Sequence, residues 1–165
     1  RGVVTTDRQL TKAKNIFFER VGKAPLQTIG PREVLEGADV LLTFGHGKPD
    51  KLCGYTVEAF GELDLSDAVV LSGSCFSGLG FTQAAIKGGA VAVYGHLKLN
   101  AGFPTLYPSL ESLLQGACLG RVQQELINAM RVSAARSKRR SRDPQNSYLY
   151  VVVGDPALRP FKPAF

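Results

Sequence analysis

The sequence has 165 residues, 44% of them hydrophobic and 21% charged, which is enough for one globular domain with a sizeable core. No apolar run approaches the roughly 18 residues that a transmembrane helix needs, so we expect no membrane partner. The formal net charge is +6, and much of the excess lies in residues 136–142, a basic stretch without interleaved aromatic residues. We therefore expect no nucleic-acid partner, and interpret the stretch as a solvated loop, with a cleavage point or an anion site as alternatives.

The three cysteines, Cys53, Cys75 and Cys118, are an odd number and form no CxxC pair. No histidine lies at a spacing suited to zinc, so we predict neither a disulfide framework nor a metal or other cofactor. Free thiols favour a reducing compartment, and we expect a cytoplasmic location. Because the chain begins at Arg1 rather than Met, we expect a fragment, a processed chain or a trimmed one.

Strand and helix patterns alternate along the chain. We predict strands over 2–6, 26–29, 39–44, 68–72, 90–94 and 148–153. Helices are predicted between them over 8–21, 31–35 and 78–87, and a helical pattern covers 108–137, where Gly116 and Gly120 could break it. Residues 45–64 are predicted as a loop with a short helix or hairpin near 56–60. This alternation is typical of an α/β fold with a mostly parallel central sheet and helices on both faces. Without repeats or linkers, residues 1–165 are expected to form a single domain.

A histidine and a cysteine follow two of the predicted buried strands. His46 comes just after the strand 39–44, and Cys75 comes just after the strand 68–72. Sites in open α/β sheets form beyond the carboxyl ends of the strands, so both side chains share one rim if these strands are neighbours. An imidazole there can accept the thiol proton, and the thiolate is then a nucleophile. The alternative is that Cys75 is a small core residue and His46 a satisfied polar group.

Small residues flank both of these side chains. Gly47 allows a sharp turn and exposes an N–H group, and the Cys75 N–H lies near the start of the next predicted helix. Two such donors could hold the oxyanion of a tetrahedral intermediate. His96 follows the strand 90–94 on the same rim, where it either shapes a pocket or is a polar loop residue. Cys53 and Cys118 are interpreted as structural.

The motifs LLTFGHG and VVLSGSC, in that order, resemble those of the caspase-like cysteine peptidases of clan CD. The segment VVTTDRQLTKAKNIFFERVG and the closing YVVVGDPAL are similar to those of gingipain-type peptidases and CHAT domains, so the resemblance covers nearly the whole chain. It implies a caspase-like three-layer sandwich. It also implies His46 as general acid or base, Cys75 as nucleophile, and the N–H groups of Gly47 and Cys75 as oxyanion hole.

The activity that this resemblance implies is that of a cysteine endopeptidase, which cleaves a peptide or protein substrate through an acyl-enzyme intermediate and uses no cofactor. The alternative is a non-catalytic or latent CHAT-like regulatory domain that needs a partner, a ligand, a flanking domain or a cleavage. In this family's sheet order, the strand before Asp7 lies beside the strand before His46. Asp7 would then orient His46 or line a pocket for a basic side chain, unless it is a helix N-cap. Ser74 and His96 are further pocket candidates.

Overall fold

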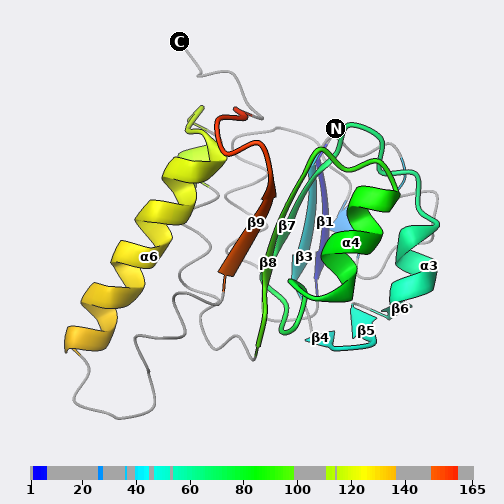
Figure 1. Cartoon of the computed structure of the whole chain (residues 1–165), viewed down its shortest axis with the longest axis horizontal. Helices are drawn as coiled ribbons and strands as arrows, with labels where there is room; N and C mark the ends of the chain where they lie inside the picture. The colour runs from blue at the N-terminus through cyan, green and yellow to red at the C-terminus, as the bar shows by residue number, and fades with distance from the viewer. Residues whose placement is uncertain are drawn as a thin grey trace.

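The computed structural model describes residues 2–6, 26–27, 36, 40–44, 47–52, 54–98, 111–113, 115–136 and 150–159 (Figure 1). The helices predicted over 8–21 and 31–35 lie outside these residues. Asp7, His46 and Cys53 also lie outside them, as does most of the basic stretch 136–142.

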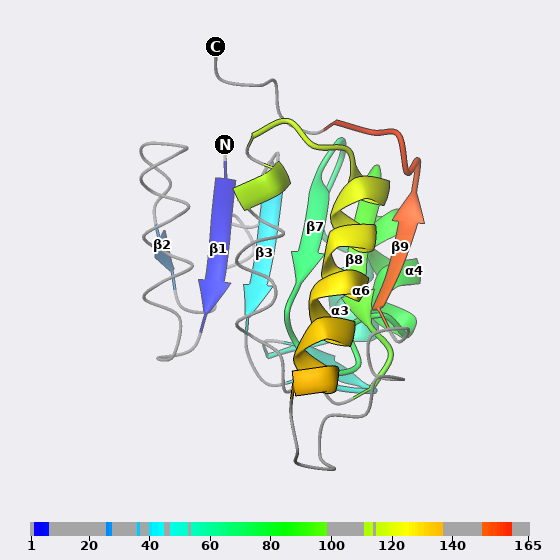
Figure 2. The same ribbon diagram turned by 90° about the vertical axis from the view of Figure 1, so that its left-hand side faces the viewer.

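Within the described residues, six strands form one sheet in the order β2-β1-β3-β7-β8-β9. Their bounds are β1 (Gly2–Thr6), β2 (Leu26–Gln27), β3 (Val40–Phe44), β7 (Val69–Ser72), β8 (Ala92–His96) and β9 (Tyr150–Gly154). The first five strands in this order pair in parallel, and β9 runs antiparallel to β8 (Figure 2). The sheet is therefore mixed, and the predicted α/β class is confirmed.

Helices cover both faces of this sheet (Figures 1 and 2). The short helix α3 (Val57–Gly61) and helix α4 (Gly80–Lys87) lie on one face, and α6 (Leu119–Arg136) lies on the other. Helix α4 connects β7 to its parallel neighbour β8, as a crossover connection requires. Among the described helices, none combines the length and the apolar composition needed to cross a bilayer.

The helical pattern predicted over 108–137 is interrupted where the sequence suggested. Gly116 has a φ of +89°, a left-handed conformation that favours glycine and ends a helical turn. Gly120 does not break the pattern, because it lies inside α6. Its N–H donates to the carbonyl of Pro156 at 2.8 Å, so this glycine allows α6 to approach the segment that follows β9.

The core between the sheet and the helices α3 and α4 is aromatic at its centre. Phe60 of α3 and Phe81 of α4 meet edge to face, with ring centroids 5.7 Å apart. Both side chains are 2% exposed. All four residues of β7 are buried, as expected for a strand covered on both faces. Packing of α3 and α4 on this face therefore holds β7, and the segment that follows it, in place.

A second, small sheet follows β3 along the chain. It contains three short antiparallel strands, β4 (Gly47–Lys48), β5 (Lys51–Leu52) and β6 (Tyr55–Thr56), and lies at the carboxyl ends of β3 and β7 (Figure 2). Leu52 is 1% exposed and packs in the same apolar cluster as Phe60, which ties this sheet to the core. The region predicted as a loop over 45–64 therefore contains both a hairpin and the helix α3.

Strand β8 begins two residues later than predicted and ends two residues later. The N–H groups of Ala90 and Val91 donate to the carbonyls of Ala85 and Ala68 at 3.0 and 2.9 Å. Ala90 therefore closes the end of α4, whereas Val91 bonds to Ala68, the residue before β7. At its other end β8 extends to His96, which pairs with Tyr150 of β9, so His96 is the last residue of the strand and not a loop residue after it.

Replacement of Phe81 by alanine should lower the free energy of unfolding by about 3–5 kcal/mol, because it leaves a cavity against Phe60. Urea denaturation followed by circular dichroism measures this loss. The matched control is Ile86→Ala on the same helix, where the side chain is 39% exposed. That change should cost less than about 1 kcal/mol, and equal losses for both variants would contradict the packing described here.

Candidate active site

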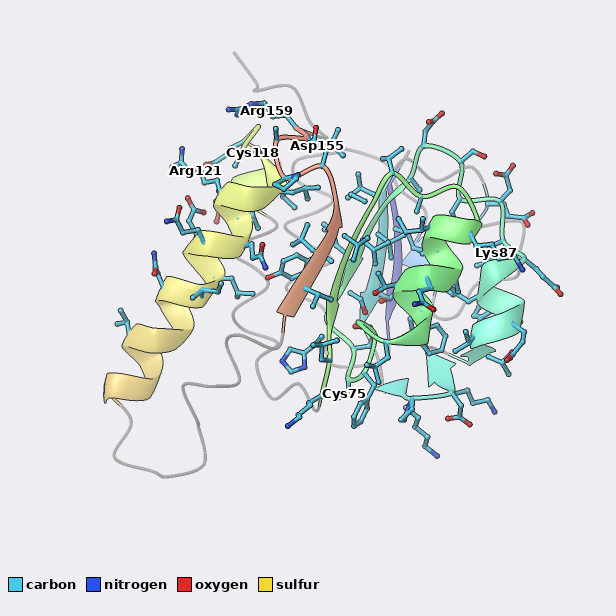
Figure 3. All side chains as sticks on the ribbon, in the orientation of Figure 1. Cys75, Lys87, Cys118, Arg121, Asp155 and Arg159 are labelled. Atoms are coloured by element: carbon cyan, nitrogen blue, oxygen red, sulfur yellow. The ribbon has the colours of Figure 1, made fainter. Side chains whose placement is uncertain are left out.

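The parallel pairing of β3 with β7 brings two chain segments to one edge of the sheet. Thr43 of β3 stands opposite Ser72 of β7, and the Gly73 N–H donates to the Thr43 carbonyl at 2.9 Å. Both strands end at this edge, so the segments that follow them leave it side by side. Cys75 follows β7 and lies at the same edge of the molecule as the small sheet (Figure 3).

Gly47 and Cys75 approach each other through their backbones. A Cβ atom on Gly47 would fall on the carbonyl group of Cys75 and would lie 3.2 Å from its amide nitrogen. Any other residue at this position would collide with the Cys75 backbone. Gly47 is therefore required by this close approach and not only by the sharp turn that its sequence context predicts. His46, the residue before Gly47, lies outside the described residues.

Buried hydroxyl groups connect the ends of the two strands. The Thr43 Oγ1 donates to the Ser72 Oγ at 2.6 Å, and the same Ser72 oxygen accepts from the Ser74 N–H at 3.3 Å. The Ser74 hydroxyl points back to the Thr43 carbonyl at 3.5 Å. Ser74 is 0% exposed, so its side chain supports the segment before Cys75 from inside the protein.

The segment around Cys75, residues 73–79, is bound to the end of β8. The Ser77 hydroxyl donates to the Ser74 carbonyl at 2.8 Å and accepts from the His96 N–H at 3.1 Å. The Gly78 N–H donates to the His96 carbonyl, and the Phe76 N–H donates to the Lys98 carbonyl. These bonds fix the segment on both sides of Cys75.

Phe76, the residue after Cys75, has a φ of +57°. This left-handed conformation is an outlier for a bulky side chain and costs on the order of 1–3 kcal/mol. It persists because the N–H groups of Phe76 and Gly78 bond to the Lys98 and His96 carbonyls, which lie in a different chain segment. Backbone strain of this kind clusters at functional sites.

His96 is buried beneath this segment, with 1% of its surface exposed. Its ring Nδ1 lies 2.8 Å from the Lys98 carbonyl oxygen and 3.2 Å from the Lys98 nitrogen. It donates to the carbonyl when that nitrogen is protonated and accepts from the N–H group when it is not. Both its backbone and its ring therefore help to shape the rim next to Cys75.

Cys75 itself is half-buried and is not part of a disulfide. Cys118, at the start of α6, is in no disulfide either, and Figure 3 shows it far from Cys75. Helix α4 begins five residues after Cys75, at Gly80, so a turn and not a helix directly follows the cysteine. The predicted positions of Asp7 and His46 lie outside the described residues.

Of the supporting hydroxyls, only Ser74 was predicted at this site, as a pocket residue, and those of Thr43, Ser72 and Ser77 were not. Thr43 and Ser72 are polar residues near the ends of two apolar strands. The sequence shows this, but only the strand register shows that the two residues stand opposite each other. Ser77 carries no such signal, because its role depends on the end of β8, which is 19 residues away in the sequence.

Comparison with known proteins shows the fold and leaves the family open. No family model matches the chain, and no curated protein matches it. Fifteen chains of solved structures match, among them one described as "Structure of Protease", with a TM-score of 0.73 and 12% sequence identity. The match covers 98% of this chain and 48% of that one, so this chain spans about half the length of its structural neighbour. At this identity, the likeness shows a shared fold.

Replacement of Gly47 by alanine should destabilise the protein by about 1–3 kcal/mol, because the new Cβ forces the small sheet away from Cys75. Thermal unfolding measures the loss, and the alkylation rate of Cys75 reports the displaced rim. The matched control is Gly61→Ala, where the Cβ would meet its nearest neighbour, the Ala84 Cβ, at 3.4 Å. A stable Gly47→Ala variant with unchanged alkylation would contradict the close approach.

Replacement of Ser77 by alanine should cost about 1–3 kcal/mol, because the His96 N–H and the Ser74 carbonyl both lose a buried partner. Hydrogen exchange should show faster exchange at Phe76 and Gly78. The control is Ser66→Ala, an exposed serine that bonds Asp64 at 2.6 Å. Comparable losses for the two serines would show that Ser77 has no special role.

Proposed function

We propose that this chain is a caspase-like cysteine endopeptidase domain in which Cys75 is the nucleophile and His46 the general acid and base. The observation that carries the proposal is the close approach of the Gly47 backbone to the Cys75 backbone. Because His46 directly precedes Gly47 in the sequence, this backbone contact supports the assignment of His46 as the partner of Cys75.

The pairing of β3 with β7 supports the same assignment. His46 follows β3 and Cys75 follows β7, and these strands are parallel neighbours that end at one edge. The structural likeness to a protein described as a protease supports a peptidase function. The strained turn at Phe76 and the buried hydroxyls give the nucleophile a fixed position, which covalent catalysis requires.

The proposed reaction is acyl transfer followed by hydrolysis. His46 takes the proton of the Cys75 thiol, and the thiolate sulfur forms a bond to the carbonyl carbon of the substrate. The resulting oxyanion is held by the N–H groups of Gly47 and Cys75. His46 then gives its proton to the leaving amine as the peptide C–N bond breaks. Water, deprotonated by His46, finally attacks the thioester and releases the acid and the thiol.

Peptide acyloxymethyl ketones with Arg, Lys, Asp, Asn or Leu at P1 test this function. The Cys75 sulfur displaces the carboxylate leaving group and leaves one covalent adduct, which intact mass spectrometry detects. We expect an adduct on the parent protein and none on Cys75→Ala. The Cys118→Ala variant should still be labelled, and it controls for reaction at Cys118, which is in no disulfide. His46→Ala should slow labelling by about 100-fold or more, as loss of a general base does.

A folded protein that none of the five ketones labels at Cys75 would reject a constitutively active peptidase. The latent or non-catalytic regulatory domain would then be the better assignment. Labelling of Cys75 that does not depend on His46 would instead show a reactive surface thiol, and it would also reject the proposed dyad.

A further inference from the structure

Lysine residues flank Cys75 on two sides. Lys48 directly follows Gly47, whose backbone lies against that of Cys75. Lys51 stands opposite Lys48 in the hairpin of β4 and β5. On the other side, the Lys98 carbonyl accepts the N–H of Phe76 at 3.0 Å, which places Lys98 next to the residue that follows Cys75. We call Lys48, Lys51 and Lys98 the lysine rim.

The side chains of the lysine rim are exposed, and the part of the chain that the structure describes offers them no ion pair. The segment that carries the thiol, residues 72–79, contains no charged residue. Asp50 in the β4–β5 turn and Glu58 in the first turn of α3 are the acids closest to the rim along the chain. Among the described residues, the rim around Cys75 is therefore net positive.

Building on the peptidase function proposed above, we propose that this site takes peptide substrates with acidic side chains on both sides of the scissile bond. A peptide whose carbonyl reaches Cys75 lies between the hairpin that carries Lys48 and the segment that carries Lys98. Acidic side chains there meet an ammonium group in either direction along the peptide. Exposed ion pairs are individually weak and are screened by salt, so several must act together and the preference must fall with ionic strength.

The same charges also affect the rate of encounter. A rim of one sign steers an oppositely charged peptide towards the site and raises its association rate at low salt. A basic peptide is repelled by the same rim. The pocket for a basic side chain that Asp7 suggested predicts the reverse preference, so peptide charge distinguishes the two possibilities.

Peptide binding to the Cys75→Ala variant tests this preference without any chemical step. The probes are two fluorescently labelled peptides of equal length around a central Leu, one flanked by Asp and Glu and the other by Lys and Arg. Fluorescence anisotropy should show about tenfold tighter binding of the acidic peptide at about 50 mM salt, and a much smaller preference at about 500 mM.

Charge reversal locates the effect. Combining Lys48→Glu, Lys51→Glu and Lys98→Glu should weaken binding of the acidic peptide by about tenfold or more, with single changes giving about two- to fivefold. The matched control is Lys87→Glu, an exposed lysine that Figure 3 shows at the far end of α4 from Cys75. It should change binding by less than about twofold, because salt weakens the effect of a charge that lies away from the rim, at the other end of α4.

Equal binding of the two peptides, tighter binding of the basic one, or an equal effect of Lys87→Glu would overturn the proposal. The Leu ketone has no charge at P1, so its reaction with Cys75 tests the peptidase function independently of the preference for acidic peptides. If it labels Cys75 while the peptides show no acidic preference, the peptidase stands and the substrate proposal falls. If no ketone labels Cys75, the substrate proposal falls together with the peptidase.

Discussion

The close approach of the Gly47 and Cys75 backbones is the contact on which the arrangement of the site depends. It exists because β3 and β7 pair in parallel and end in register, with Thr43 opposite Ser72. Both segments then leave the sheet at one edge with little space between them. A side chain at position 47 would push the small sheet away, and with it the residue that precedes Gly47. Glycine at this position is thus a requirement of packing as much as of chain flexibility.

The segment around Cys75 is held more firmly than a surface loop requires. Ser77 joins it to β8 through a buried hydroxyl that both donates and accepts, and the turn at Phe76 is strained. A nucleophile gains from such restraint, because catalysis loses little entropy when the reacting group is already in place. The buried His96 also restrains this segment, because its N–H bonds to the Ser77 hydroxyl and its ring bonds to Lys98. Stability and positioning are therefore provided by the same hydrogen bonds.

The fold and the site carry different information about function. A TM-score of 0.73 at 12% identity shows that very different sequences can build this sheet with its covering helices, because hydrophobic pattern and crossover handedness leave most side chains free to vary. One fold can therefore support many activities, and the function must be argued from the residues at the strand ends. Here these are a half-buried thiol, a neighbouring glycine and a rim of lysines.

The sequence by itself determined the elements with strong local signals, which are the apolar strands, the helix α4 and the interruption at Gly116. It also sets His46 and Cys75 a few residues after two of these strands. Only the tertiary structure decided which strands are neighbours and that β9 is antiparallel, because strand pairing joins segments distant in the sequence. It also showed that the two-residue strands form a separate sheet, since strands this short have no recognisable hydrophobic period. It also decided that Ser77 supports the segment around Cys75 and that lysines distant in sequence flank this segment on two sides. Local patterns report burial and backbone preference, whereas contacts between distant segments depend on how the whole chain packs.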